Sequence, residues 1–450
     1  MRVLLVSTYE LGRQPVHLAS PAAALRRGGH EVRTVDIAVD DLTDDDVDWP
    51  DRMAISVPMH TATRLADSLV AAVHARRPDL PIALYGLYAG VGSAEVDARL
   101  EGEYEPALIE WAMGGTSTSS RHLGRSDLLV PDRRGLPGLD RYARLEHEGA
   151  TVLAGAVEAS HGCRHRCRHC PIPAVYDGRI RVVSRHDVLA DIENLVSAGA
   201  GHITFGDADF LNAPAHSVAI LEAAHEAHPE VTFDATVKVE HIIRHAAIWP
   251  HVAGLNLLFV VSAFESVDEE TLEILDKGHT VTDMVEAVAL TRDAGIHIRP
   301  TWLPFFPWTS PAEVADVFRF IDDQELTGAT DPVQLAIKLL MPKGSLLESH
   351  PAMTQYLSGY DPSALTWRWD FADPETELLY KELEAIAANA SDCGQEAITT
   401  LNEMRLVVSR ASGRELPPLQ DVTPAPRLTE SWFCCAEPTG SQTVTIGIRA

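Results

Sequence analysis

Apolar runs alternate with amphipathic segments along the first 115 residues. Short apolar runs typical of buried strands occur at residues 2–8, 31–38, 53–59 and 81–87, and helical spacing separates them. In the first expected helix, Ser20 stands as N-cap, Pro21 at the first helical position and Gly28 as the stop. This order predicts an α/β fold, with a doubly wound parallel sheet in a first domain over residues 1–130.

A second alternating series follows an expected loop at residues 113–127 and a linker at residues 131–150. Its strand-like runs are residues 151–160, 202–210, 231–239, 254–263, 296–305 and 332–340. The first helical pattern between them has Ser184 as N-cap and Gly199 as its stop. Six strand–helix units predict a partial (β/α)6 barrel over residues 151–345, with its chemistry at the C-terminal ends of the strands.

The last part of the chain, residues 346–450, predicts a mixed helical and irregular tail domain. Residues 373–390 show a helical apolar face, with Asp373 as N-cap. The proline-punctuated residues 414–428 then lead to the adjacent cysteines Cys434 and Cys435.

Composition narrows the class of protein. The chain has 450 residues, of which 46% are hydrophobic and 23% charged, as in soluble proteins of several domains. A net charge of -28 without a basic stripe argues against a nucleic-acid partner. With no apolar run of 18 residues and no signal peptide, we expect a cytoplasmic protein that does not bind membranes.

Three of the six cysteines, Cys163, Cys167 and Cys170, lie within eight residues. In a large cytoplasmic chain such clustering indicates metal or redox chemistry. Three thiolates can ligate three irons of a [4Fe–4S] cluster and leave the fourth iron open, and the neighbouring arginines 164, 166 and 168 can offset the negative charge. The alternative is a zinc site that adds one histidine, at position 161, 165 or 169.

The Cys-x3-Cys-x2-Cys spacing after the first barrel strand resembles the cluster signature of the radical SAM superfamily, over about residues 150 to 345. The resemblance implies an enzyme with a [4Fe–4S] cluster and S-adenosylmethionine (SAM). It also implies a small-molecule substrate and an electron donor such as flavodoxin or ferredoxin. His169 departs from the family pattern, because an aromatic residue more often lies against the adenine there.

The barrel strand ends supply the SAM-binding residues that this resemblance implies. They are Gly206, Asp207, Lys238, Glu240, Ser262, Glu265 and Arg299. Asp207 stands where the family has the acid of a Gly-Gly-Glu-like motif, so its carboxylate is expected at the methionine ammonium. Lys238 and Glu240 are expected at the carboxylate and ribose of SAM.

The first domain resembles the cobalamin-binding-type domain that precedes many radical SAM barrels. The likeness rests on residues 20–32 and 101–110. The chain lacks Asp-x-His-x-x-Gly after the first strand, so a cobalamin bound there would have no histidine lower ligand. The resemblance implies cobalamin as a third cofactor.

The tail sequence Phe-Cys-Cys-Ala-Glu-Pro, residues 433–438, resembles the signature of the CUAEP/CCAEP-tail radical SAM (seleno)protein family, in which some members have selenocysteine at the position of Cys434. Vicinal thiolates are soft ligands. The resemblance implies that Cys434 and Cys435 act on the substrate, in modification of a natural product or a metalloid such as arsenic. Two alternatives stay open, a cobalamin-dependent radical SAM methyltransferase and a non-catalytic metal-binding or sensor protein.

Overall fold

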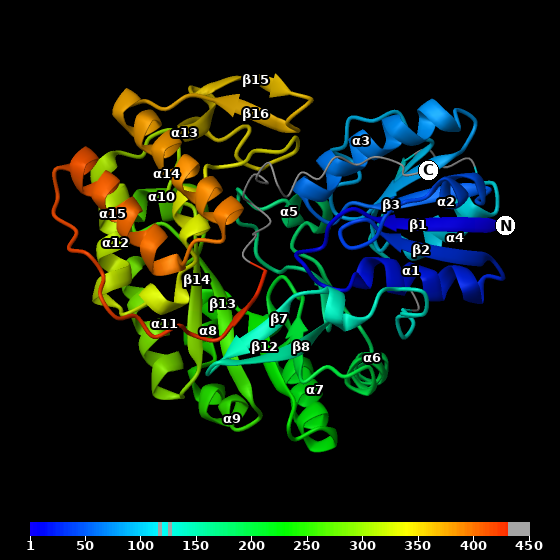
Figure 1. Ribbon diagram of the computed structural model, residues 1–450, viewed down its shortest axis with the longest axis horizontal. Helices are drawn as coiled ribbons and strands as arrows, with labels where there is room; N and C mark the ends of the chain where they lie inside the picture. Colours follow the sequence, from blue (N-terminus) through cyan, green and yellow to red (C-terminus); the bar gives the residue numbers. More distant parts are fainter. Residues whose placement is uncertain (116–118, 125–127, 431–450) are drawn as a thin grey trace.

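The computed structural model describes residues 1–115, 119–124 and 128–430 (Figure 1). Its N-terminal part is a six-stranded sheet in the order β2-β1-β3-β4-β5-β6, with every neighbouring pair parallel. The strands are β1 (Arg2–Ser7), β2 (Glu31–Asp36), β3 (Arg52–Ser56), β4 (Ile82–Tyr85), β5 (Ala98–Gly102) and β6 (Ser119–His122). The predicted doubly wound parallel sheet is confirmed.

Helices cover both faces of this sheet because β1 buries alternate residues on opposite sides. Val3 and Leu5 share a core with α1 (Val16–Arg27) and α4 (Glu105–Ala112). Leu4 and Val6 face the core that holds α2 (Asp44–Asp48) and α3 (His60–Arg76).

The start of α1 differs from the prediction. The helix begins at Val16, after Pro15, so Ser20 and Pro21 lie inside it, while Gly28 ends it as expected. A proline inside a helix leaves the carbonyl four residues earlier without a donor. Here the Tyr85 hydroxyl donates to that carbonyl, on His17, at 2.7 Å, so the sheet supplies the missing partner.

The expected loop at residues 113–127 was wrong in part, since β6 forms there. This strand is polar and pairs with β5 as the edge of the sheet. Edge strands are half-solvated, so they lack the apolar run by which a buried strand is detected.

The second sheet has the order β14-β13-β12-β11-β8-β7-β17. Five strands are parallel, namely β8 (Ala150–Val157), β11 (His202–Phe205), β12 (Thr232–Thr236), β13 (Leu257–Glu265) and β14 (His297–Trp302). The helices that separate them and flank the cysteine segment are α5 (Ile172–Tyr176), α6 (Arg185–Ser197), α7 (Pro214–Ala227), α8 (Val239–Arg244), α9 (Trp249–Ala253), α10 (Glu269–Ile274), α11 (Val281–Asp293) and α12 (Pro311–Asp323). Ser184 caps α6 as predicted.

The sixth predicted strand is reduced to one bridge. Residues Pro332–Ala336 form the 3-10 helix η5, and an isolated parallel bridge joins Phe305 to Lys338. The side chain of Gln334 accepts a hydrogen bond from the Trp302 backbone at 3.0 Å, where a full strand would present a carbonyl to β14. A side-chain amide can thus satisfy an edge strand without continuous pairing.

The predicted linker and tail complete this sheet. The linker contains η1 (Leu139–Arg141) and the antiparallel strand β7 (Arg144–His147), which pairs with β8 and with β17 (Arg427–Leu428). The remaining elements are β9 (Ser160–Gly162), β10 (Ile180–Val182), η2 (Phe210–Asn212), η3 (Ala246–Ile248), η4 (Thr327–Ala329), α13 (Pro351–Thr354), β15 (Leu357–Asp361), β16 (Thr366–Trp369), α14 (Pro374–Cys393) and α15 (Ala397–Ser412).

The tail helices α14 and α15 pack on the barrel. Leu379 and Leu383 of α14 and Met404 of α15 belong to the barrel's own apolar core. Figure 1 shows the proline-punctuated segment, in red, running from α15 along the barrel toward β7. Cys434 and Cys435 lie outside the described residues. In the described part of the chain, no helix has both the length and the apolarity needed to span a membrane.

Candidate functional site

The cysteine segment begins at the carboxyl end of the first barrel strand. After β8 the chain enters the short strand β9, and Cys163 follows Gly162 directly. Gly162 has φ +76°, and a side chain there would meet the Arg179 carbonyl at 2.4 Å, so the turn requires glycine. The side chain of Asn212, after β11, accepts the Arg164 backbone N–H at 3.2 Å. The fold therefore places the cysteine loop, residues 163–170, over the strand ends, as predicted for the barrel's chemistry.

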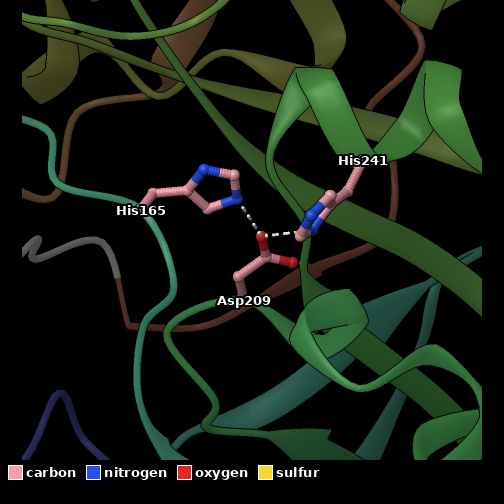
Figure 2. A group of neighbouring side chains, drawn as sticks. All are labelled: His165, Asp209 and His241. Carbon is pink, nitrogen blue, oxygen red and sulfur yellow. Dashed lines mark ion pairs between the residues drawn. The ribbon is translucent and has the colours of Figure 1, made fainter. Parts of the chain in front are cut away.

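The three thiols of this loop are free and at least half buried. Among the described residues, one group of three His, Cys, Asp or Glu side chains has ligand atoms all within 4.8 Å of one another, and it is His165, Asp209 and His241 (Figure 2). The Cys-x3-Cys-x2-Cys spacing of the loop fits three ligands of a multi-iron cluster.

A buried lysine, absent from the predicted set, compensates charge at this loop. Lys277 is 3% exposed, and its ammonium donates to Glu265 at 3.1 Å. Burial alone would lower the pKa of Lys277, but Glu265 and then Cys167 and Cys170 outweigh it and raise the pKa. Lys277 therefore stays charged beside thiols that become anionic when they ligate iron.

The loop arginines were predicted to offset the cluster charge. Two of them make contacts within the protein. Arg168 donates to the carbonyls of Glu273 and Ile274, at 2.9 and 2.8 Å. Arg166 pairs with Asp177 at the surface, at 3.1 Å. Arg166 and Arg168 therefore hold the outer side of the cysteine loop. The buried cation is Lys277, and the Lys-Gly pair that follows α10 is the sequence signal that could have identified it.

Three predicted SAM-binding residues, Glu265, Lys238 and Glu240, contact histidines of the cysteine loop. Glu265, at the end of β13, lies 3.1 Å from His169 Nε2. Lys238 Nζ lies 3.1 Å from His165 Nδ1 and 3.4 Å from Glu240. Ser262 on β13 is fully buried, and its hydroxyl has no hydrogen-bond partner among the described residues. An orphaned buried hydroxyl of this kind fits a site that holds a ligand.

Asp207 is engaged within the protein. Its carboxylate accepts the Ala159 N–H at 2.9 Å and the Ser160 hydroxyl at 2.5 Å. Burial raises the pKa of Asp207 to about 6, against the lowering effect of these hydrogen bonds. The adjacent Gly206 donates its N–H to the Val157 carbonyl at 2.7 Å. Both residues support the turn from β8 into the cysteine loop, and contact with the SAM ammonium stays a prediction.

Arg299 ties the tail to the barrel. Its guanidinium donates to Asp331 at 2.7 Å and to the Pro426 carbonyl at 3.2 Å, just before β17. The guanidinium of Arg299 therefore contacts one barrel residue and one tail residue, and its contact with SAM stays a prediction.

A buried network of acids and histidines joins the cysteine loop to the N-terminal sheet. His161 of β9 lies 3.0 Å from Glu103, after β5, and 3.4 Å from Glu158, after β8. His17 of α1 lies 3.0 Å from Glu10, after β1, and 3.6 Å from Glu158. The cysteine loop thus lies against the carboxyl edge of the parallel sheet, where α/β folds bind their ligands.

The comparisons agree with this geometry. Residues 157–321 match the radical SAM superfamily. The chain is 22% identical over 321 residues to a hopanoid C-3 methylase of Methylococcus capsulatus, covering 63% of this chain and 60% of that protein. It is also 22% identical over 275 residues to a hopanoid C-2 methylase of Rhodopseudomonas palustris, covering 59% of this chain and 52% of that protein. The chain thus spans less than two thirds of these relatives.

Solved structures show the same fold. The cobalamin-dependent SAM radical enzyme OxsB, with aqua-cobalamin and S-adenosylmethionine bound, has a TM-score of 0.66 at 15% identity, covering 92% of this chain and 71% of that one. The radical SAM methyltransferase TsrM from Kitasatospora setae has a TM-score of 0.55 at 18% identity, covering 71% of each chain. Residues 157–321, which contain the cysteine loop, thus match the radical SAM superfamily of enzymes, and the two-sheet fold is shared with these solved structures.

Proposed function

We propose that this protein is a cobalamin-dependent radical SAM methyltransferase acting on a small molecule. The observation that carries the proposal is the junction of the two sheets. The cysteine loop is held against the carboxyl edge of the N-terminal sheet through His161 and Glu103. A cofactor bound at that edge would face the cysteine site directly. The methylase names of the curated relatives, and the cobalamin bound by OxsB, support the same function.

The residues present fit these cofactors. Cys163, Cys167 and Cys170 would ligate a [4Fe–4S] cluster, and the loop after β1, residues 8–15, holds no histidine, which fits a corrinoid without a histidine ligand. When bound, the cluster and the corrinoid would supply the electron for SAM cleavage and the methyl carrier.

The chain's own residues would bind and orient the reactants. Lys277 stabilises the anionic thiolates, and its pairing with Glu265 fixes the end of β13 beside His169. Ser262 and Glu240 would offer polar groups to SAM. An external one-electron protein donor, such as flavodoxin or ferredoxin, would reduce the cluster.

Anaerobic reconstitution tests the function. The protein is supplied with iron, sulfide and hydroxocobalamin, then with SAM and a reductant, and 5′-deoxyadenosine and S-adenosylhomocysteine are quantified. We expect both products, and we expect the Cys163→Ala, Cys167→Ala, Cys170→Ala variant to form neither. Formation of 5′-deoxyadenosine alone would refute methyl transfer. Stoichiometric zinc without labile sulfide would refute the radical SAM function as a whole.

A second candidate function rests on where the described chain ends. A side chain built on Gly12, in the loop after β1, would meet the Glu430 carboxylate at 2.4 Å, so residue 430 lies on the β1 loop at the sheet junction. This position supports a tail whose Cys434 and Cys435 bind a soft substrate atom, as in metalloid modification. Loss of product in Cys434→Ser, with SAM cleavage intact, is the expected result. Normal turnover by the Cys434→Ser, Cys435→Ser double variant would refute it.

A further inference from the structure

We propose that His165, Asp209 and His241 form a metal site separate from the cysteine cluster, which binds one first-row divalent cation such as Zn²⁺. The three side chains come from separate segments (Figure 2). His165 lies within the cysteine loop, Asp209 follows β11, and His241 lies on α8. Their ligand atoms lie within 4.8 Å of one another.

The contacts within this group are close, but they lack hydrogen-bond geometry. Asp209 Oδ2 lies 2.7 Å from His241 Nδ1 and 3.4 Å from His165 Nε2. None of these three atoms has a hydrogen-bond partner among the described residues, although all three are buried. A ring N–H lies in the plane of its imidazole and must point at its acceptor. Here three buried ligand atoms lie close together, but no ring N–H points at the carboxylate. This is the arrangement expected when the three atoms share a cation.

Burial makes an empty arrangement costly. Asp209 is 1% exposed and His241 is 4% exposed. A buried carboxylate oxygen without a donor loses its hydration with no compensation, and a bound cation restores it.

Outer contacts orient the ligands. Asp209 Oδ1 accepts the Leu211 N–H at 3.1 Å, which leaves Oδ2 for the cation. The other ring nitrogen of His165, Nδ1, faces both the Lys238 ammonium at 3.1 Å and Glu240 Oε2 at 3.5 Å. Lys238 pairs with the same carboxylate at 3.4 Å and balances its charge. A metal-bound histidine whose second nitrogen faces a carboxylate is a recurring arrangement at zinc sites.

The donor set selects the class of ion. Two imidazoles and one carboxylate suit Zn²⁺, Fe²⁺ or Co²⁺, and leave a coordination position for water or a substrate group. Because His165 lies between Cys163 and Cys167, the ion would also fix the cysteine loop to β11 and α8. This gives the barrel a second inorganic centre beside the SAM site.

Zinc analysis of the cluster-loaded full-length protein tests the site. The reconstituted protein is incubated with ZnSO₄ and desalted, and iron and zinc are counted by mass spectrometry. We expect about one zinc per chain in addition to the cluster iron. Asp209→Asn and His241→Ala should each lower retained zinc at least tenfold with iron unchanged. The control is His245→Ala, whose ring centroid lies 5.6 Å from that of His241 but which is outside the group, and it should keep its zinc.

Cobalt provides a second measurement that does not depend on the iron cluster. Co²⁺ added to the Cys163→Ala, Cys167→Ala, Cys170→Ala variant should give weak visible absorption without thiolate charge-transfer bands, and His165→Gln in that background should abolish it. Wild-type protein that retains no zinc would overturn the site and leave a metal-free His–Asp–His ion-pair group. Zinc or cobalt binding unchanged by the Asp209 and histidine substitutions would overturn it equally.

Discussion

Lys277 shows how one buried charge can serve a cofactor site. Its ammonium is buried against Glu265, which also lies 3.1 Å from His169. Burial opposes ionisation of Glu265, but Lys277 and His169 lower its pKa to about 2. Both partners therefore stay charged in the interior, and removal of either one leaves an uncompensated charge.

Lys277→Met should destabilise the protein by about 3 kcal/mol, because Glu265 would keep only His169 as a counter-charge. The free energy of unfolding, from urea titration of cluster-free protein followed by circular dichroism, measures the change. Lys277→Met with Glu265→Gln should recover part of the loss. Lys343→Met, at an exposed position, should change stability by less than about 0.5 kcal/mol. Equal effects of Lys277→Met and Lys343→Met would contradict the buried pair.

At the scale of elements, side chains from neighbouring strands hold the cysteine loop. Asp207, after β11, fixes the turn between β8 and β9 through Ala159 and Ser160. Asn212, in η2, holds the backbone of Arg164. The loop that carries the cysteines is therefore positioned by the next strand of the barrel, before any cofactor binds.

Asp207→Ala should lower the iron bound after reconstitution, and should cost about 1–3 kcal/mol, since it leaves the buried Ala159 N–H without an acceptor. Iron per chain and the melting temperature are the measurements. Asp207→Asn keeps one acceptor oxygen, so its losses should be smaller. If Asp207→Ala binds iron normally and only its SAM affinity falls, the residue acts as the SAM ligand predicted from the sequence.

Helix α14 gives an element-scale test of capping. The Asp373 carboxylate accepts the Glu375 N–H at 3.0 Å at the start of α14. Asp373→Ala should cost about 1 kcal/mol, measured as a shift of the urea midpoint at unchanged slope. Asp373→Asn, which retains a capping oxygen, should cost much less. Similar losses in the two variants would show that charge, and not capping, stabilises this helix end.

For the whole molecule, the junction of the two sheets depends on paired buried charges. His17 bridges Glu10, on its own side, and Glu158, at the end of β8. Arg133, in the predicted linker, forms a second tie, with both nitrogens of its fork 2.7 Å from Asp191 of α6. These ion pairs therefore help to fix the cysteine loop relative to the N-terminal sheet.

His17→Gln should reduce the pH dependence of stability. Burial lowers the pKa of His17, but Glu10 and Glu158 outweigh it and raise the pKa from its ordinary 6.5 to about 9. A group with a raised folded pKa contributes stability that is complete below pH 6.5 and is lost as pH rises through 9. Wild-type protein should therefore lose about 3 kcal/mol over this range that His17→Gln does not lose.

Melting temperatures at half-unit pH steps measure this difference. The control is His251→Gln, since His251 pairs with Glu222 at the surface, where its side chain is 52% exposed. Its pH profile should follow wild type. A His17→Gln profile parallel to wild type would mean that His17 is neutral at the junction.

The alternation of strands and helices, the parallel sheets and the cysteine spacing could all be predicted from the amino-acid sequence. These depend on local information, because apolar periodicity and capping residues such as Ser184 and Asp373 act within a few positions along the chain. The sequence-based prediction was wrong where a side chain from a distant segment makes a hydrogen bond that the backbone would normally make. The Tyr85 hydroxyl permits Pro21 inside α1, and the Gln334 amide replaces the backbone of a sixth strand.

Tertiary structure alone decided which side chains meet. Lys277, Asp209 and His241 are separated by many residues from the cysteines, and no periodicity marks them. Folding brings them to the cysteine loop because parallel strands end at one edge. It also commits Asp207 and Arg299 to partners within the chain, since a buried charge must be satisfied by whatever lies nearest. The order of the elements follows from the sequence. The contacts, the burial and the ion pairs of the site residues follow from the packing of distant segments.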